Sequence, residues 1–535
     1  MIDLLQLHRA GWFVEQFQVS VIAKWYIYVR YLLLVLVALA IHRVYVAFWT
    51  SPLRNIRGSF VSRITSLRTE LFSVGGYSSY LAKTDFENYG DISVLMPNAV
   101  GIGNPADIRA LLGNPTVRKA DHYKVLRFTG TENTVSARDF ELANSRHHQL
   151  GPYFNPSYLS KMEQKIMDHG ILSIKKKWDE LIVQAPTGRA EVNYCDDFLY
   201  LAFDTIGVLA FGKQIEELSV NDTPTAKWVA SMIFYLGVRA LFQLLPSWLA
   251  TLMLYPWEGR YNRFSAYAHE SIATRRQLLA AQTKVDEDCK KPADLLQAFI
   301  DAEDPASKVR MDSEHIHGEC VLMMMAGSDT VSGTLTWAVH LLMLYPECYK
   351  RAVAEVRGQF SQDHVITYSE SRAHLPFVEA CLYESLRLAP ITGGYLPRMS
   401  PKGGTTIQGH YIPEGTMILV NMFAANNHPA FWNQPRIFNP QRFLDDDSAR
   451  HNVLTFSSGK RVCPGRQLAW WEMLTVFSNI LKDYDWELPA DYTHLGPNVL
   501  DKHGHPKQMD ETQFIIIKPA NPDRDCRLVV SKHKE

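Results

Sequence analysis

A single cysteine in a glycine-bounded loop is the residue of this 535-residue chain best suited to chemistry. Cys463 lies in the stretch FSSGKRVCPG, residues 456–465, just before a helical pattern that begins near Arg466. Gly459 and Gly465 allow the backbone to turn tightly and to approach a flat ligand. Loop N–H groups and the helix N-terminus would stabilise a thiolate, which can bind haem iron axially. The alternative is a buried structural cysteine in a turn.

The spacing F-x-x-G-x-R-x-C-x-G resembles the signature of the cytochrome P450 family. Its fixed positions are Phe456, Gly459, Arg461, Cys463 and Gly465. The resemblance implies that Cys463 is the axial metal ligand of haem b, iron protoporphyrin IX, and that the loop contacts this cofactor. We expect Arg461 to pair with a haem propionate through charge-assisted hydrogen bonds.

Two charged residues, Glu384 and Arg387, are three positions apart and therefore share one face of a predicted helix. By itself such a pair is typical of a solvated helix. The segment PQRF that follows, residues 440–443, resembles the P-x-R-F segment of the same family. The resemblance implies that Arg442 joins Glu384 and Arg387 in a buried structural triad beneath the haem.

Small and polar residues interrupt a long helical pattern over residues 316–344. Ala326 and Gly327 resemble the start of the A-G-x-D-T oxygen-activation segment and would allow close approach to the haem face. The polar residues there can loosen the helix hydrogen bonding and form a local groove. The resemblance assigns Asp329 and Thr330 to proton delivery toward dioxygen. The alternative is a polar break in a core helix.

Further basic residues are candidates for binding the haem propionates. Arg398 follows the Glu-x-x-Arg helix where the family has a propionate-binding arginine. On the helix over the propionates the family often has W-x-x-x-R, whereas this chain has Ala143 and His147 at those positions. We take His147 as the candidate, with Arg146 and His148 as alternatives. A solvated basic turn would explain the same residues without any cofactor.

The composition limits the class of protein. Charge is balanced, with 55 Lys and Arg against 56 Asp and Glu, so we expect no nucleic-acid partner. Seven widely spaced cysteines do not suggest a disulfide framework, and a reducing compartment fits better. No linker or repeat interrupts residues 52–535. We expect one catalytic domain over residues 50–535, mainly α-helical with small β-sheets, in the cytochrome P450 fold that the resemblance implies.

An apolar segment predicts a transmembrane anchor over residues 25–49, after a short N-terminal segment of residues 1–24. Its uninterrupted apolar part, residues 31–41, is short, so a signal peptide or an interfacial helix is an alternative. Four arginines follow it: Arg54, Arg57, Arg63 and Arg68. They favour a single-pass anchor with the catalytic domain facing the cytoplasm. Eukaryotic members of the family are anchored in this way in the endoplasmic reticulum membrane.

The substrate pocket is predicted by position within the family. Residues 228–257, rich in Leu, Phe, Met and Trp, would roof the pocket and dip into the membrane. Its walls would be residues 125–128, 323–325 and 391–396. Such a lining suits an apolar molecule with few polar groups.

The resemblance implies a haem-thiolate monooxygenase that inserts one oxygen atom of O2 into a lipophilic small molecule. Electrons would come from NADPH through NADPH–cytochrome P450 reductase, with cytochrome b5 as a second candidate donor. Residues 326–330 and 465–469 resemble fungal members that act on terpenoid, alkaloid or polyketide products. One alternative is a haem-thiolate isomerase or dehydratase without external O2, against which Asp329 and Thr330 argue. The other is a non-catalytic haem-binding membrane protein.

Overall fold

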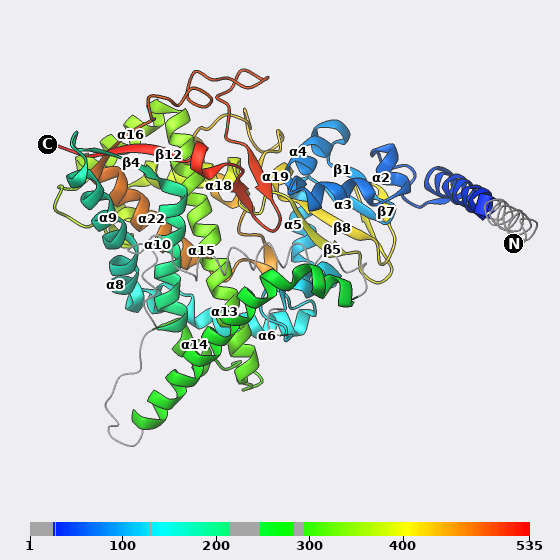
Figure 1. Ribbon diagram of the computed structural model, residues 1–535, viewed down its shortest axis with the longest axis horizontal. Helices are drawn as coiled ribbons and strands as arrows, with labels where there is room; N and C mark the ends of the chain where they lie inside the picture. Colours follow the sequence, from blue (N-terminus) through cyan, green and yellow to red (C-terminus); the bar gives the residue numbers. More distant parts are fainter. Residues whose placement is uncertain (1–24, 27, 128–129, 213–246, 283–293, 535) are drawn as a thin grey trace, which may run out of the picture.

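Helix α15 (Ser313–Leu344) runs through the middle of the protein, and the other elements are arranged around it (Figure 1). The structure, a computed structural model, describes residues 25–26, 28–127, 130–212, 247–282 and 294–534. The Asp312 side chain caps α15 by accepting a hydrogen bond from the His315 N–H. Most positions from Cys320 onward are apolar, and most of them are buried, as expected for a helix in the interior of a large protein.

Two further long helices pack against α15. Helix α10 (Tyr194–Phe211) is capped by the Asn193 side chain, which accepts hydrogen bonds from two N–H groups of the first turn. It ends at Gly212, whose φ of 65° lies in the left-handed region that favours glycine. Helix α13 (Ser247–Gln282) crosses α15 near the lower end of α15 in Figure 1. These crossings build the helical body of the protein.

Shorter helices cover this body and the sheets. In chain order the α-helices are α2 (Phe60–Ile64), α3 (Leu67–Val74), α4 (Ser78–Tyr89), α5 (Pro105–Gly113), α6 (Phe140–Leu150), α7 (Pro156–Leu159), α8 (Glu163–Ile166), α9 (Leu172–Gln184), α14 (Leu295–Asp301), α16 (Pro346–Gln359), α17 (Tyr368–His374), α18 (Pro376–Leu388), α19 (Met422–Asn426), α20 (Arg442–Asp445), α21 (Ala449–Asn452), α22 (Arg466–Asp483) and α23 (Pro522–Asp525). Short 3-10 or π-helical turns are η1 (Val46–Thr50), η2 (Asp121–Leu126), η3 (Gly151–Tyr153), η4 (Ser160–Met162), η5 (Met167–Ile171) and η7 (Gly459–Arg461).

The largest sheet has five strands in the order β1-β2-β8-β5-β3. Its strands are β1 (Ile92–Met96), β2 (Ala99–Ile102), β3 (Arg118–Lys119), β5 (Tyr395–Met399) and β8 (Met417–Asn421). Strands β2 and β8 pair in parallel, and the other pairs are antiparallel. At the β3 edge Lys119 lies opposite Arg398, so the sheet brings two basic residues together from distant parts of the chain.

Three smaller sheets lie elsewhere in the described residues. They are β4 (Arg189–Asn193) with β12 (Arg527–Lys532) and β9 (Tyr484–Glu487), β6 (Thr405–Ile407) with β7 (His410–Ile412), and β10 (Glu511–Gln513) with β11 (Ile517–Pro519). The predicted class, mainly α-helical with small β-sheets, is therefore confirmed. None of the six cysteines within the described residues forms a disulfide.

A separate apolar helix over Tyr28–Thr50 extends away from the body near the N-terminus (Figure 1). The mean hydropathy of its most apolar window is 2.1, and only 6% of that window is buried. Its 23 residues would span about 34 Å, enough to cross a bilayer. Its position agrees closely with the segment predicted at residues 25–49, whereas residues 1–24 lie outside the described part.

The segment predicted to roof the pocket is described only in part. Residues 228–246 lie outside the described residues, and residues 247–257 form the start of α13. Trp248, Leu252 and Tyr255 on this part of α13 are exposed. Exposed large apolar side chains grouped on one element suit contact with a membrane or another apolar surface.

Candidate active site

The Cys463 loop leads directly into α22. The Cys463 N–H donates to the Phe456 carbonyl at 2.9 Å and closes the loop. The N–H groups of Gly465 and Arg466 donate toward the sulfur, and with the Arg466 charge they oppose the effect of burial, which raises the pKa of the Cys463 thiol. Donors directed at a sulfur stabilise it as an anion. The loop is thus arranged to offer a thiolate to a metal.

The two loop glycines have different surroundings. Gly459 has a φ of 69°, and a Cβ there would lie 2.7 Å from the Leu112 carbonyl oxygen of α5. The absence of a side chain at Gly459 therefore lets the loop backbone approach α5. The sequence predicted a different reason, namely the approach of the loop to a flat ligand. A Cβ at Gly465 would lie 4.0 Å from the Cys463 sulfur, so this position borders the sulfur.

One face of α15 is half-open, meaning that its residues are partly exposed, although the rest of this part of the helix is buried. Between residues 316 and 344 the half-open positions are Met323, Ala326, Gly327, Thr330 and Gly333. Their spacing places them on one side of a helix. None of residues 455–467 is fully buried, and α22, which begins in this stretch, packs against α15. Two half-open surfaces on neighbouring elements fit the presence of a large flat cofactor in a site built by both.

Gly327 has a packing role as well. A Cβ at this position would lie 2.8 Å from Ile206 of α10, closer than side-chain atoms approach one another. The sequence interpretation attributed the absence of a side chain to the haem face. The structure gives close packing of α10 on α15 as a second reason, which the motif alone does not contain.

The polar residues of α15 form defined contacts. Thr330 Oγ1 donates to the Ala326 carbonyl at 2.7 Å. Asp329 Oδ1 accepts from Lys518 Nζ of β11 at 2.7 Å, while Asp329 Oδ2 is buried without a hydrogen-bond partner among the described residues. Helix α15 is continuous over Ser313–Leu344, so the predicted loosening of its backbone is not observed. Asp329 and Thr330 are adjacent, and Thr330 is on the half-open face.

Four basic residues gather beside the Cys463 loop. Burial, and then the charges of Arg398 and Arg461, lower the pKa of Lys119 well below its ordinary value. Burial, and then the charges of Lys119 and Arg461, lower the pKa of His147. Mutual effects of this kind require the four groups to be close in space. We call Lys119, His147, Arg398 and Arg461 the basic cluster.

Within the described residues, no member of the basic cluster donates a hydrogen bond to a carboxylate, and the nearby charge of Glu319 only partly opposes the lowering of the Lys119 pKa. Lys119 Nζ donates to the Val135 carbonyl at 2.6 Å, and Arg398 donates to the Tyr123 hydroxyl at 3.0 Å. Arg461 donates to two backbone carbonyls at 3.0 and 3.1 Å. Buried cations held only by neutral oxygens retain the capacity to bind an anion. The two propionates of a haem fit this requirement.

The structure distinguishes the three candidates on α6. Arg146 donates to Gln149 Oε1 at 2.7 Å, and the charges that act on it are those of Glu319 and Asp312. His148 Nδ1 lies 4.0 Å from Asp304 Oδ2. Only His147 is affected by members of the basic cluster.

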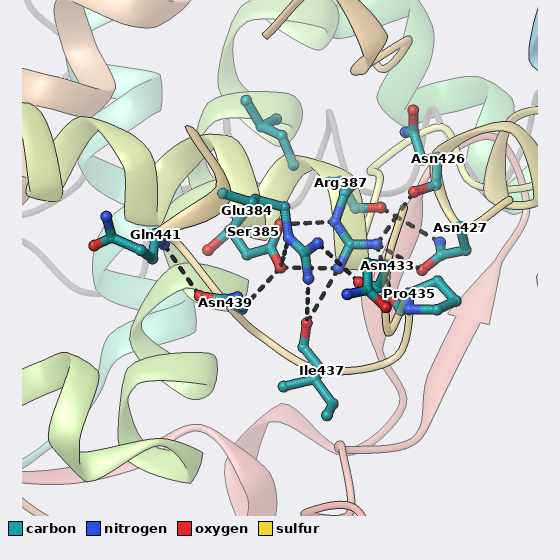
Figure 2. Close-up of polar contacts among 12 residues, drawn as sticks. Glu384, Ser385, Arg387, Asn426, Asn427, Asn433, Pro435, Ile437, Asn439 and Gln441 are labelled. Carbon is teal, nitrogen blue, oxygen red and sulfur yellow. Dashed lines mark hydrogen bonds and ion pairs between the residues drawn. The ribbon is translucent and has the colours of Figure 1, made fainter. Parts of the chain in front are cut away.

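Glu384, Arg387 and Arg442 also lie together, as Figure 2 shows for the surroundings of Glu384 and Arg387. Arg387 donates to both Glu384 oxygens at 2.7 and 2.9 Å, and Arg442 donates to Glu384 Oε1 at 3.1 Å. Arg387 also donates to backbone carbonyls, among them that of Pro435 at 2.8 Å, and to the Asn427 side-chain oxygen at 3.2 Å. Both members of the Glu384–Arg387 pair are fully buried, which excludes a solvated helix for this pair.

A family model described as "Cytochrome P450" matches residues 83–498. The chain belongs to the cytochrome P450 family. It is 44% identical to cytochrome P450 monooxygenase helB1 of Aspergillus fumigatus, over 92% of this chain and 84% of that one. It is 43% identical to helB2 of the same fungus, over 91% and 96% of the two chains. The protein is therefore a P450 monooxygenase, an oxidoreductase, as the sequence predicted.

The fold agrees with this assignment. The structure superimposes on the cytochrome P450DA heme domain with a TM-score of 0.70 at 21% identity, covering 86% of this chain and 93% of that one. The P450 fold is thereby confirmed. The family implies a haem-thiolate cofactor, a redox partner and a substrate oxidised with O2. The donors around Cys463 and the basic cluster fit such a cofactor.

Three residues of this P450 site were missed by sequence reasoning: Lys119, Tyr123 and Lys518. Lys119 is brought to Arg398 only by the β3–β5 pairing. Lys518 reaches Asp329 from the C-terminal hairpin of β10 and β11. No local spacing in the sequence indicates either contact. The first depends on strand pairing and the second on contact between the β10–β11 hairpin and α15, and both join distant segments of the chain.

Proposed function

We propose that this P450 inserts one oxygen atom of O2 into a lipophilic small molecule, by hydroxylation, epoxidation or a related oxidation. The observation that carries the proposal is the Asp329–Thr330 pair beside the half-open face of α15, with one carboxylate oxygen anchored and the other free of hydrogen bonds to described residues. Electrons would come from NADPH through NADPH–cytochrome P450 reductase, with cytochrome b5 as a second donor. We place the substrate among terpenoid, alkaloid or polyketide products of fungal secondary metabolism, because residues 326–330 and 465–469 resemble fungal members.

We assign the binding of haem b to two groups of residues. Cys463 would be the axial ligand, in a loop that includes Phe456 and is bordered by Gly465. The basic cluster, with the Tyr123 hydroxyl, would hold the two propionates through charge-assisted hydrogen bonds. When bound, the haem supplies the redox chemistry that no protein side chain can perform.

Asp329 and Thr330 would move protons at defined atoms. Lys518 holds Asp329 Oδ1, so the side chain is oriented while Oδ2 can accept or release a proton. Thr330 Oγ1 donates to the Ala326 carbonyl and can accept a hydrogen bond from a water or from Asp329. Proton delivery of this kind contributes to catalysis when donor and acceptor are positioned in advance.

We infer that the Tyr28–Thr50 helix anchors the protein in the endoplasmic reticulum membrane as a single-pass segment. Its length, its hydropathy and the exposure of its side chains support the anchor. The arginines that follow it support a catalytic domain facing the cytoplasm. An anchored enzyme would meet its lipophilic substrate and its reductase at the same membrane surface.

Isotope incorporation tests the proposed reaction. The purified enzyme, its reductase and NADPH are incubated under ¹⁸O₂ with a panel of fungal terpenoids, alkaloids and polyketides, and products are analysed by mass spectrometry. We expect one ¹⁸O atom per oxidation and one NADPH consumed per product. Product formation without NADPH and without ¹⁸O would support the isomerase or dehydratase. Haem binding without any turnover would support the non-catalytic protein.

A further inference from the structure

Three potential metal ligands meet where α13 crosses the first turns of α15. His269 comes from α13, and Glu314 and His317 come from α15, and one ligand atom from each lies within 4.8 Å of the others. His269 Nε2 is 3.6 Å from Glu314 Oε1. The two imidazole rings are in contact, with centroids 3.5 Å apart. The crossing is at the lower end of α15 in Figure 1.

One backbone carbonyl orients both imidazole rings. The Ser265 carbonyl oxygen lies 3.2 Å from His269 Nδ1 and 3.1 Å from His317 Nε2. The Ser265 hydroxyl also lies 3.3 Å from His317 Nε2, and a hydroxyl can accept as well as donate. Because a carbonyl can only accept, we assign the hydrogen to each of these nitrogens. In the neutral rings the lone pairs are then on His269 Nε2 and His317 Nδ1. Metal-binding histidines are typically held in this manner, with the second nitrogen donating to a carbonyl or carboxylate.

The lone pair of His317 is left without a partner. His317 is 1% exposed, and its Nδ1 is buried with no hydrogen-bond donor among the described residues. A buried acceptor without a donor costs free energy. A metal ion beside His269 Nε2 and Glu314 would satisfy it. A metal ion shared with His269 and Glu314 would explain why this acceptor has no donor.

We propose that His269, Glu314 and His317 bind a divalent transition-metal ion of the zinc class, with water as the fourth ligand. Two imidazole nitrogens and one carboxylate oxygen form a donor set that zinc accepts in tetrahedral sites. Bonds of about 2.1 Å in a tetrahedron place the ligand atoms about 3.4 Å apart. The separation of 3.6 Å between His269 Nε2 and Glu314 Oε1 is close to this requirement.

The metal would act as a clamp and not in the oxidation. His317 precedes Asp329 by 12 positions on a continuous helix, which corresponds to about 18 Å. The metal therefore lies far from the proton-delivery pair. It would join α13 to α15, while the exposed side chains of His269 and Glu314 leave it open to exchange with solvent. Metal binding would thus restrict movement of α13, whose first turns carry exposed apolar residues.

Metal retention tests the site in the full-length, haem-loaded protein without a histidine tag. The protein is treated with EDTA, mixed with ZnCl₂, dialysed and analysed for zinc. We expect wild type to retain one zinc ion per chain, and His269→Ala and Glu314→Gln to weaken binding by roughly tenfold or more. The side chains of His269 and Glu314 are 51% and 56% exposed, so the variants should fold and keep the wild-type haem spectrum.

His315→Ala is the matched control. His315 lies between the two α15 ligands and pairs with Asp312 at 2.8 Å, outside the triad. We expect it to retain zinc as wild type does. Equal zinc retention by wild type and by the His269→Ala Glu314→Gln double variant would overturn the site. So would a zinc–sulfur distance of about 2.3 Å in X-ray absorption, because it would place the ion on a cysteine.

Hydrogen exchange tests the clamp separately. Zinc should slow amide exchange in the part of α13 around His269 in wild type and leave exchange in the His269→Ala variant unchanged. Bound zinc with unaltered exchange in wild type would refute the clamp. Neither readout depends on monooxygenase activity, so failure of the metal site and failure of the proposed reaction can be told apart.

Discussion

Two buried groups of charges in this protein are built on opposite principles. Around Arg387, each cationic donor meets the Glu384 carboxylate or a carbonyl, and the pair is fully buried. In the basic cluster, the hydrogen bonds of Lys119, Arg398 and Arg461 go to neutral acceptors, and burial together with like charges lowers the pKa of Lys119 and of Arg461. The first group is electrostatically complete and holds the fold together. The second is incomplete, and we propose that a ligand supplies the missing negative charge.

The largest expected effect comes from breaking the complete group. Glu384→Ala leaves the Arg387 guanidinium buried without its carboxylate and should lower the free energy of unfolding by about 3 to 5 kcal/mol. Glu347→Ala is the control, because Glu347 pairs with Lys350 on an exposed face of α16 and its loss should cost less than about 1 kcal/mol. Urea unfolding of both variants gives the comparison. Equal effects would mean that the buried pair contributes no more than a surface pair.

Glu472 of α22 differs from both groups, because it is a buried carboxyl without a partner among the described residues. Burial raises the pKa of Glu472 from 4.5 to about 8, and its Oε1 has no hydrogen-bond partner among the described residues. As pH rises above 4.5 the unfolded chain loses this proton while the folded protein retains it, so stability falls until about pH 8.

Glu472→Gln should therefore raise the free energy of unfolding by about 3 kcal/mol at pH 7 and have little effect at pH 4.5. Unfolding of wild type and variant across this pH range measures the difference. A constant difference at all pH values would show that packing, and not the proton, is responsible.

Loss of one charge from the basic cluster should weaken haem binding and leave the fold stable, the opposite of the effect expected for Glu384→Ala. Lys119→Met removes one charge from the basic cluster, so haem should dissociate roughly tenfold faster or more, while the haem-free protein should lose no stability from the missing charge. Haem transfer to apomyoglobin measures the rate. Lys124→Met, on an exposed residue of η2 paired with Asp121, should leave it unchanged. If Lys119→Met destabilised the haem-free protein but left haem retention normal, the role of Lys119 would be to stabilise the fold and not to bind haem.

The Asp329–Lys518 pair has features of both groups. One Asp329 carboxylate oxygen is paired with Lys518, and the other has no hydrogen-bond partner among the described residues. Lys518→Met should leave Asp329 misoriented and lower product per NADPH several-fold, less than the roughly hundredfold loss expected when a general acid is removed entirely. Peroxide per NADPH should rise in parallel.

Thr330→Ala should behave similarly with haem binding intact, and unchanged coupling in both variants would remove the proton-delivery role.

The sequence predicts what depends on short spacing. The Cys463 loop, the Glu384–Arg387 pair and the adjacent Asp329 and Thr330 are each contained in a few consecutive residues, so their types and order suffice. Lys119 and Lys518 are different, because strand pairing brings Lys119 to Arg398 and the fold of the C-terminal hairpin brings Lys518 to Asp329. The proposed choice of His147 over Arg146 and His148 also depends on the structure, because the side chains of neighbouring residues on one helix point in different directions.

The edge of the five-stranded sheet has a consequence for how the protein matures. Lys119 and Arg398 oppose each other on its last two strands, and their like charges repel until an anion arrives. Closure of this edge and insertion of the haem would then be one event in biogenesis, joining an early and a late segment of the chain. During production in a host cell, a shortage of haem would then leave this edge of the sheet unpaired in more of the chains.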